Sequence, residues 1–307
     1  MKKLVIVGTV AFDAVETPFG KTDKILGGAA TYIGLAASKL NVDAAIVSIV
    51  GGDFPKKNIS LLEKNGLSVE GLEMVKNGKT FFWSGKYHND MNTRDTLATE
   101  LNVLENFSPK VPANYTGAEI VMLGNLHPGV QLEVVAQMEN PKLTVLDTMN
   151  FWMDNTPGLL RDVIKKVDVI TINDEEARQL SSEYSLLNAA KKIMAMGPRY
   201  VVIKKGEHGA LLFHGTHVFS APAMPLAQVF DPTGAGDTFA GGFTGYLAKL
   251  GRYDFETMKS AIIYGSALAS FTVEKFGTER LITVTKDEIR QRIAQFKNMT
   301  QFEITIA

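Results

Sequence analysis

Short runs of valine, isoleucine and leucine recur along the chain, and most are continuous rather than alternating with polar residues. Strands that are buried on both faces have this pattern. Between the runs lie segments with the period of an amphipathic helix, so the alternation predicts a parallel sheet covered by helices on both sides. The predicted strands are Leu4–Val7, Ala44–Val50, Ile120–Leu123, Leu143–Leu146, Val167–Ile172 and Tyr200–Ile203, and the predicted helices are Ala29–Leu40, Lys57–Asn65, Val130–Glu139, Leu159–Lys165, Asp174–Leu180 and Leu187–Met196.

The stretch Val69–Leu104 departs from this alternation. It is rich in β-branched, aromatic and charged residues, has a turn dipeptide at Asn77-Gly78, and alternates in polarity from Lys79 to Tyr87. These features predict antiparallel strands that project from the main domain. Two interpretations remain open, a hairpin at the edge of the sheet or a lid that closes over a substrate cleft. Residues 12–25 are a second candidate segment for such a lid.

The C-terminal part of the chain is strongly helical, and Gln228–Phe230 just before it has the pattern of a strand end. No internal repeat or low-complexity linker divides the chain. We therefore predict a single domain over residues 1–307 that carries the lid as an insertion. The predicted C-terminal helices are Thr238–Leu250, Phe255–Val273 and Lys286–Lys297.

The composition is that of an ordinary globular protein, because 45% of the 307 residues are hydrophobic. The formal net charge is -1 and the basic residues form no stripe, so we expect no nucleic-acid partner. No run reaches the roughly 20 apolar residues that span a bilayer, and Asp13 interrupts the apolar start of the chain. This start is predicted to be a buried first strand, with no membrane partner. The absence of cysteine excludes disulfides and thiolate chemistry and fits a cytoplasmic protein.

A glycine-rich turn that leads directly into a helix is the segment best suited to chemistry. It contains Gly234, Ala235, Gly236 and Asp237. Glycine lets backbone N–H groups approach a ligand closely, and the start of a helix offers unpaired donors and about half a positive charge. The segment therefore predicts an anion-binding site.

Asp237 is an unusual residue in a site suited to phosphate. As a helix cap, it would compete with an anionic ligand for the same N–H groups. A carboxylate that faces a substrate hydroxyl can instead orient it and accept its proton during phosphoryl transfer. The structural alternative is that Asp237 caps the helix and Gly241-Gly242 allow close packing. If Asp237 accepts the proton of a substrate hydroxyl, the segment indicates phosphoryl transfer to an alcohol.

Other phosphate motifs do not compete with this one. Neither Gly20-Lys21-Thr22 nor Gly78-Lys79-Thr80 has the earlier glycine that a Walker A loop requires. Gly8-Thr9-Val10 is no dinucleotide fingerprint, and Phe239 stands where the segment that starts at Gly234 would need glycine or alanine. These observations disfavour a nicotinamide-dependent oxidoreductase.

The longer string from Asp231 to Phe243 resembles the second signature of the ribokinase-like (pfkB) carbohydrate kinase family. The match includes Asp231, Pro232, the Gly-Ala-Gly-Asp segment, the small Gly241-Gly242 pair and apolar Phe243. The resemblance implies an α/β fold, a ribokinase-like three-layer sandwich with a mainly parallel central sheet and a small β-strand lid. It also implies a catalytic base at Asp237 and an anion hole at the N–H groups of residues 234 to 237.

Near the N-terminus, the same resemblance implies the substrate-binding residues. Asp13 is similar to an aspartate at the end of the family's first strand that hydrogen-bonds sugar hydroxyls. Gly27 and Gly28 are similar to a Gly-Gly pair where the backbone passes close to the substrate. Tyr32 stands where the family has an asparagine that often contacts the sugar. An aromatic ring there suits stacking on a base or covering a sugar face, so the identity of the substrate stays open.

The central and later segments resemble the family's nucleotide site. Asn173 and Glu176 are similar to an Asn-x-x-Glu motif near the triphosphate, where magnesium is held through water. From the residues alone, Asn173 is also a good helix N-cap with acids in the first turn, and both roles are compatible. Lys204 and Gly206 resemble the strand and turn that meet the nucleotide, and the resemblance assigns Thr233 to it as well. The implied cofactors are ATP and magnesium.

Two further segments are weaker matches. Asp147 and Asn150 resemble a family strand end that faces the cleft. Phe276-Gly277-Thr278 resembles a loop that helps to bind a monovalent cation in several relatives, together with the backbone around Asp231. Asp231 is therefore a candidate for a potassium site.

Together these features predict an ATP-dependent phosphotransferase that acts on a hydroxyl of a sugar. Two alternatives remain open, a nucleoside kinase of the adenosine type and a sugar- or nucleotide-binding relative that has lost the reaction. The exposed edges of the lid strands also lead us to expect a homodimer that pairs through them.

Overall fold

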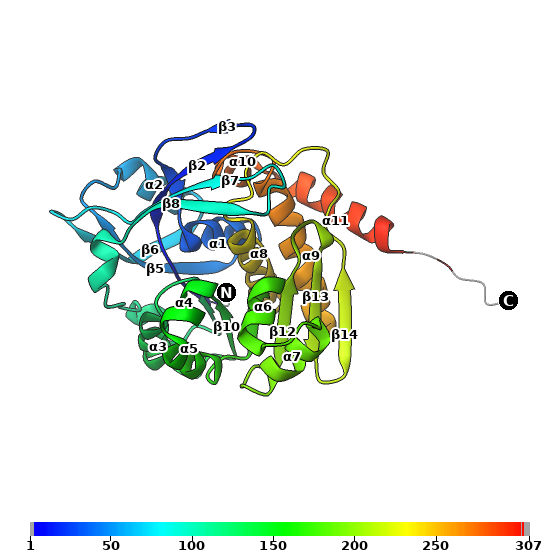
Figure 1. Cartoon of the computed structure of the whole chain (residues 1–307). Coiled ribbons are helices and arrows are strands. Elements are labelled where there is room, and N and C mark those ends of the chain that lie inside the picture. Colours follow the sequence, from blue (N-terminus) through cyan, green and yellow to red (C-terminus); the bar gives the residue numbers. More distant parts are fainter. Residues whose placement is uncertain (1–2, 302, 304–307) are drawn as a thin grey trace.

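The computed structural model of the chain describes residues 3–301 and residue 303. In this part of the chain the largest element is a nine-stranded sheet, with the order β14-β13-β12-β11-β10-β9-β1-β5-β6 (Figure 1). Neighbouring strands from β12 to β6 are parallel, whereas β13 and β14 are antiparallel. The strands are β1 (Lys3–Val7), β5 (Asp43–Gly51), β6 (Leu67–Val75), β9 (Ile120–Leu123), β10 (Leu143–Asp147), β11 (Val169–Asn173), β12 (Tyr200–Lys204), β13 (Ala210–His214) and β14 (His217–Ala221).

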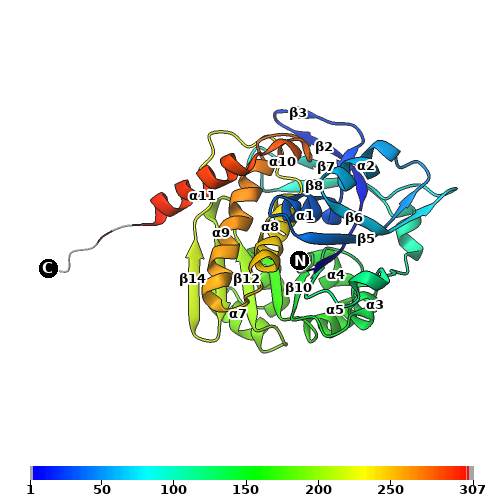
Figure 2. The ribbon, with the colours of Figure 1, turned by 180° about the vertical axis from the view of Figure 1, so that it is seen from behind.

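Helices cover both faces of this sheet, which confirms the predicted sandwich. One face, at the front of Figure 1, carries α3 (Pro128–Gln137), α4 (Asn150–Asn155), α5 (Pro157–Ile164), α6 (Asp174–Ser181) and α7 (Leu186–Met194). The other face, at the front of Figure 2, carries α1 (Ala29–Ser38), α2 (Lys56–Lys64), α8 (Ala235–Leu250), α9 (Phe255–Thr272), α10 (Glu279–Thr283) and α11 (Lys286–Thr300).

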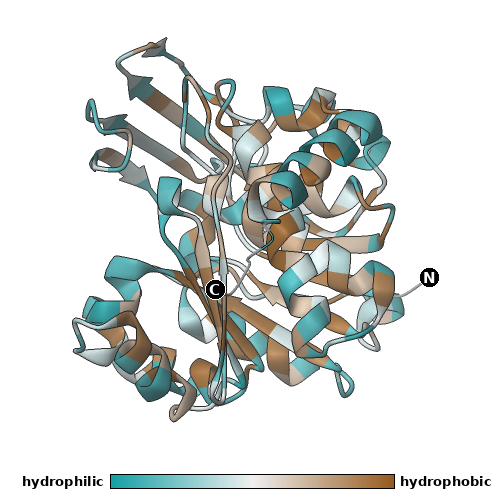
Figure 3. Cartoon of the chain, turned by 90° about the vertical axis from the view of Figure 1, so that its right-hand side faces the viewer, coloured by the Kyte–Doolittle hydropathy of each residue, from teal (hydrophilic) through white to brown (hydrophobic). Residues whose placement is uncertain are grey.

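The strand residues alternate between the two cores that these helices close. In β1, Leu4 and Ile6 pack toward α1 and α8, whereas Val5 and Val7 pack toward α3 and α5. All four side chains are fully buried. The continuous apolar runs of the sequence therefore reflect strands with a core on each side. Figure 3 shows the result as hydrophobic strands between helices whose outer surfaces are hydrophilic.

A second, five-stranded sheet lies beyond one edge of the sandwich in the described structure. It has the order β3-β2-β7-β8, and β4 pairs with β2 on the side. The predicted second lid segment, residues 12–25, lies within it. The bounds are β2 (Ala11–Thr17), β3 (Gly20–Lys21), β4 (Ile25–Gly27), β7 (Phe82–Tyr87) and β8 (Arg94–Glu100).

Three details of the sequence-based prediction are wrong. The range predicted for the lid starts too early, because β6 pairs in parallel with β5 and belongs to the large sheet. The segment Gln228–Phe230 forms no strand, and its Phe230 N–H instead donates to Val273 O. Asp13 does not end the first strand, because the chain bends after β1 and Asp13 lies inside β2 of the small sheet.

Several elements also escaped prediction. The hairpin of β13 and β14 was missed because it is half exposed and too short for a clear period, and α4 and α10 span only six and five residues. No helix in residues 3–301 is long and apolar enough to cross a membrane.

The close approach of α8 to α1 depends on glycines in α8. A Cβ on Gly241 would lie 2.2 Å from Ile33 O, and a Cβ on Gly245 would lie 2.9 Å from Ala37 Cα. Real Cβ atoms do not approach backbone atoms so closely, so these two positions admit no side chain without a shift of the helices. Close packing of helices, the structural alternative for the Gly241-Gly242 pair, is therefore part of the role of this pair.

We expect Gly241→Ala to lower the free energy of unfolding by about 1–3 kcal/mol, because the new methyl group forces α8 away from α1. Gly158→Ala is the matched control, since Gly158 is exposed in α5 and a Cβ there meets nothing within 4 Å. The control should change the free energy of unfolding by no more than about 0.5 kcal/mol, as is usual for an exposed position where the new side chain meets nothing. Urea unfolding of the two variants measures both values. Equal stability of the two variants would contradict the packing argument.

Candidate active site

The polar residues predicted to carry the chemistry gather at one edge of the large sheet. Parallel strands place their C-terminal ends at the same edge, where ligands of α/β proteins commonly bind. Asp147, Asn173 and Lys204 are the last residues of β10, β11 and β12. Helix α8 begins at this edge, and the small sheet covers it (Figure 1). Asn150, the other residue of the weak central match, is exposed at the start of α4.

The turn before α8 has the backbone geometry of an anion site. Gly234 occupies the N-cap position with φ 74° and ψ 3°, a left-handed conformation that favours glycine. Its carbonyl accepts from Thr238 N at 2.8 Å. The N–H groups of Gly236 and Asp237 follow in the first turn, where helix geometry supplies no acceptor. These donors and the helix dipole favour a negatively charged ligand.

Asp237 is partly buried within this first turn, and its carboxylate does not cap the helix. No side-chain capping bond is found at the start of α8 in the described structure. Burial raises the pKa of Asp237 to about 7; Asp147 acts in the same direction, and Lys204 acts in the opposite one. A carboxyl with a pKa near neutrality is suited to accept a proton at physiological pH.

Lys204 brings its ammonium group close to the turn. Its Nζ lies 3.2 Å from Asp147 Oδ2, and both side chains are largely buried. The same Nζ lies 3.2 Å from the position that a Cβ on Gly236 would take. Burial alone would lower the pKa of Lys204, but the carboxylates of Asp147, Glu176 and Asp237 more than offset it. The ammonium group therefore stays charged beside the N–H donors.

Asp13 lies on the opposite side of the site, against the chain at Gly27 and Gly28. A Cβ on Gly27 would lie 1.9 Å from Asp13 Oδ2, so only glycine leaves room for this carboxylate. Burial raises the pKa of Asp13 to about 7, although the Gly28 N–H bonds to it and lowers the value. The two glycines thus hold a buried carboxyl in place.

Tyr32 is fully buried beneath the glycine turn. A Cβ on Gly234 would lie 2.5 Å from three atoms of the Tyr32 ring. The ring is therefore covered on this side and offers no open face for a base or a sugar. Its hydroxyl is buried without a hydrogen-bond partner in the described chain, and the carboxylates of Asp13, Asp231 and Asp237 all act on it.

Asn173 and Glu176 form a reciprocal helix cap at the start of α6. Asn173 N donates to Glu176 Oε2 and Glu176 N donates to Asn173 Oδ1, both at 2.8 Å. Burial raises the pKa of Glu176 to about 7, and Lys204 opposes this effect. The capping interpretation of Asn173 is therefore realised. Within the described residues, no group of three or more acids or histidines could hold a metal by direct ligation.

Asp231 and Thr233 fix the loop that precedes the turn. The Asp231 carboxylate is fully buried and accepts from Thr233 N and Gly277 N, both at 2.8 Å. The hydroxyl of Thr233 donates to that of Tyr87 in β7 at 3.3 Å. The loop at Phe276-Gly277-Thr278 thus does lie against Asp231, and the small sheet is bonded to the glycine turn through Thr233.

Two residues that the sequence did not single out reach this site, one from the β7-β8 turn and one from the start of β8. Asn92 Oδ1 lies 3.2 Å from the position of a Cβ on Gly206, so the β7-β8 turn crosses to the opposite wall. Arg94 pairs with Tyr87 in the β7-β8 ladder. Burial dominates the raised pKa values of Asp237 and Glu176, but Arg94 lowers both. Neither residue belongs to a motif, so only their place in the lid segment could have indicated them.

The whole chain is similar to known kinases. The model of the pfkB family carbohydrate kinase matches residues 1–284. The cytidine kinase of Thermococcus kodakarensis is 29% identical over 248 residues, which are 79% of this chain and 87% of that protein. The nucleoside kinase of Methanothermobacter thermautotrophicus is 25% identical and covers 96% of this chain, with 97% of its own length matched.

Solved structures show the same fold. The ribokinase of Giardia lamblia superposes with a TM-score of 0.80 at 17% identity, covering 96% of this chain and 99% of that one. The aminoimidazole riboside kinase of Salmonella enterica, complexed with aminoimidazole riboside and an ATP analogue, has a TM-score of 0.73 at 19% identity, with 95% and 99% covered. The predicted ribokinase-like sandwich is therefore confirmed.

We expect Asp237→Asn to raise the thermal stability of the ligand-free protein at pH 8. The pKa of Asp237 is about 7 in the folded chain and ordinarily 3.8. Between about pH 4 and pH 7 the unfolded chain has therefore released a proton that the folded chain still holds, and stability falls as the pH rises through 7. Asparagine avoids this loss, so its gain in melting temperature should grow from pH 5 to pH 8.

The Asp23→Asn substitution is the control for that measurement, since it removes an exposed carboxylate that belongs to neither the turn nor the buried cluster. It should leave the melting temperature unchanged at both pH values. A gain for Asp237→Asn that is independent of pH would show that its carboxyl does not titrate in this range.

Proposed function

The chain belongs to the pfkB carbohydrate kinase family and is an ATP-dependent kinase of alcohol groups, and we propose that its acceptor is a ribose hydroxyl of a nucleoside. The observation that carries the mechanism is the uncapped carboxylate of Asp237 beside the N–H donors of α8. The substrate class rests on the relatives, because three that match 79%, 96% and 97% of this chain are named cytidine kinase, nucleoside kinase and nucleoside kinase.

In the proposed reaction, the oxygen of the substrate hydroxyl attacks the γ-phosphorus of ATP, and Asp237 accepts the proton of that hydroxyl. The bond to the bridging oxygen of ATP breaks, and that oxygen leaves with ADP. The N–H groups of Gly236 and Asp237 and the ammonium group of Lys204 stabilise the charge that develops on the transferred phosphoryl group. Donors fixed in advance of the reaction act most strongly in a site that excludes water.

Residues of the central strands fit the cofactor that the family uses, which is ATP with magnesium. Glu176 is buried with a raised pKa, so a nearby cation would favour its charged form. With Asn173 beside it, the pair suits a hydrated ion rather than a direct ligand cage. Bound magnesium neutralises phosphate charge and orients the triphosphate. We propose that Asn173, Lys204, Gly206 and Thr233 line the nucleotide side.

On the acceptor side, we propose that Asp13 binds two neighbouring hydroxyls, with Gly27 and Gly28 close to the sugar ring. A carboxylate can accept from both hydroxyls of a ribose. This arrangement suits a free sugar as well as a nucleoside, and ribokinase of Bacillus subtilis is 23% identical with 96% of this chain covered. A free pentose is therefore the second candidate.

Three finer features remain proposals. Asp231 and the Phe276-Gly277-Thr278 loop are a candidate potassium site, supported by the buried carboxylate that Gly277 N contacts. The lid strand β8 exposes Leu97 at 57% of its surface, which supports a homodimer through the lid strands. The absence of cysteine supports a cytoplasmic location.

A coupled ADP-release assay with magnesium-ATP tests the proposal. The acceptors are nucleosides, pentoses, hexoses and sugar phosphates, and each is measured in potassium chloride and in sodium chloride. We expect a nucleoside to give the highest kcat/KM, at least about tenfold above ribose. Asp237→Asn should lower kcat by roughly 10²–10⁴-fold, the usual contribution of a general base, and still bind ATP.

Each other outcome points to one part of the proposal. Wild-type turnover by Asp237→Asn would overturn the mechanism. A preference for ribose would overturn the nucleoside and leave the kinase reaction intact. Tight binding of a nucleoside without turnover of any acceptor would identify a relative that has lost the reaction.

Arg94 should contribute to phosphoryl transfer from the lid. We expect Arg94→Ala to lower kcat by about 10–100-fold, because a positive charge that acts on Asp237 is lost. The melting temperature should change little, since Arg94 is exposed in the ligand-free chain. Arg161→Ala, an exposed arginine of α5, is the control and should retain wild-type kcat. Equal kcat in the two variants would remove Arg94 from the mechanism.

A further inference from the structure

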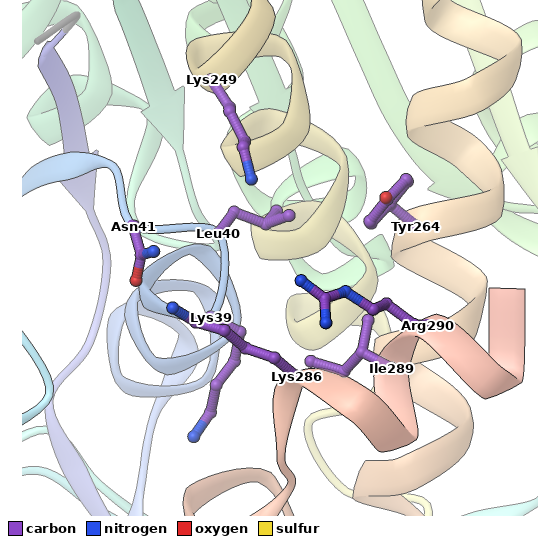
Figure 4. Close-up of a pocket in the computed structure, with 8 residues that line it drawn as sticks. All are labelled: Lys39, Leu40, Asn41, Lys249, Tyr264, Lys286, Ile289 and Arg290. Carbon is purple, nitrogen blue, oxygen red and sulfur yellow. The ribbon is translucent and has the colours of Figure 1, made fainter.

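A cavity of about 190 Å³ lies at the ends of α1 and α8 that are remote from the active site (Figure 4). Helix α8 has 16 residues, so its two ends are about 24 Å apart. Residues of α9 and α11 line its other sides. Leu40 and Ile289 are buried at its base. No residue that the candidate active site contains lines it.

The walls of this cavity carry four cationic side chains, which are Lys39, Lys249, Lys286 and Arg290. Among the described residues that line it, none is acidic. In Figure 4, Lys249 extends from α8 toward Leu40, and the guanidinium group of Arg290 reaches the same space from α11. Charges of one sign from three helices therefore meet around one hollow.

Helix ends account for only part of this charge. The C-terminal ends of α1 and α8 each contribute about half a negative charge, which cations in the last turn ordinarily complement. One nearby carboxylate, Asp287, pairs with Arg290 at 2.8 Å, and the two side chains are 80% and 76% exposed. Such an exposed pair is weak, so it leaves the guanidinium group available. The two helix ends and Asp287 offset about two of the four positive charges.

Lys39 independently indicates that the cavity lacks a negative charge. Its Nζ donates to the carbonyl of Ile282 at 2.8 Å, which is a neutral partner. Burial lowers the pKa of Lys39, and no carboxylate contributes to the shift. A partly buried ammonium group without an acidic partner is costly, and an anion bound nearby would reduce that cost.

We propose that this cavity binds the phosphate group of a small phosphorylated metabolite. A phosphate monoester carries about -1.5 to -2 charges at pH 7, which matches the surplus of the cavity. Arginine can bind two of its oxygens at once, and lysine binds it as a point charge. The apolar base at Leu40 and Ile289, with the ring of Tyr264 beside it, suits the carbon skeleton that the phosphate carries.

Occupancy of the cavity has a physical route to the active site. Helix α1 begins at Gly28, beside Asp13, and helix α8 begins at the Gly234 turn. An anion that joins Lys39 at the end of α1 to Lys249 at the end of α8 would hold the remote ends of both helices together. We therefore expect the ligand to stabilise the protein as a whole.

Calorimetric titration of the full chain tests the proposal, with inorganic phosphate and ribose 5-phosphate as probes. The protein is first saturated with magnesium and a non-hydrolysable ATP analogue, so that the N–H donors at Gly234 do not compete for the probe. Sodium chloride at matched ionic strength gives the background. We expect one site, and a rise of the melting temperature of roughly 2 °C when the probe is at tenfold its Kd.

Two double variants of equal charge decide the location of the site. Lys249→Ala with Arg290→Ala removes two cations of the cavity and should weaken both probes at least tenfold. Lys57→Ala with Lys297→Ala removes two exposed lysines elsewhere and should leave binding within twofold. Both variants should keep wild-type kcat, which shows that they fold.

The two probes separate the sources of the phosphate. Equal affinities would show that the phosphate group alone is recognised, and tighter binding of ribose 5-phosphate would show that the attached skeleton is recognised as well. Either result supports the proposal. Failure of wild-type protein to bind either probe, or equal binding by the Lys249→Ala/Arg290→Ala variant, would overturn it.

Discussion

The close packing of α8 against α1 is the constraint on which the rest of the site depends. Gly241 and Gly245 bring the two helix backbones together, so the position of α8 is fixed relative to α1 over several turns. The first residue of each helix lies in the active site. The Gly234 turn therefore rests on the ring of Tyr32, which α1 carries, and cannot move independently of the chain at Gly28 that holds Asp13.

Electrostatics give this rigid frame its chemical character. Asp13, Asp147 and Glu176 are buried around the site, with Asp237 partly buried among them, whereas Lys204 is the cation that lies within the cluster. Burial dominates the raised pKa of each of these carboxyls. A protein without ligands holds this cluster at a cost in stability, which is common at sites arranged for catalysis. Cationic groups that arrive with a ligand or with the lid lower that cost.

The sequence predicted the framework well because its strands are buried on both faces. Where short continuous apolar runs such as Ile120–Leu123 alternate with helical segments, buried strands are their common explanation. The alternation of strands and helices along the chain then predicts a parallel sheet. The glycine turn was visible for a different reason, since Gly234 has a conformation that favours glycine and is followed at once by a helix.

Residues that act through tertiary contacts could not be predicted in this way. β6 carries the charged residues Glu70 and Glu73, as expected of a lid strand, yet it pairs with β5 at the edge of the large sheet. Arg94 and Asn92 reach the site only because the β7-β8 turn folds across it. The ring of Tyr32 suggested an exposed stacking surface, and only the packing beneath Gly234 shows that it is covered.

The contact between Asn92 and Gly206 has a consequence for the order of events in a catalytic cycle. β7 pairs with β2, which carries Asp13, and the β7-β8 turn reaches Gly206. With the acceptor at Asp13 and the nucleotide at Gly206, as proposed above, this one hairpin would lie beside both ligands. Both products would then leave after the same opening motion, and the rate of that motion would set an upper limit on turnover however fast the chemical step is.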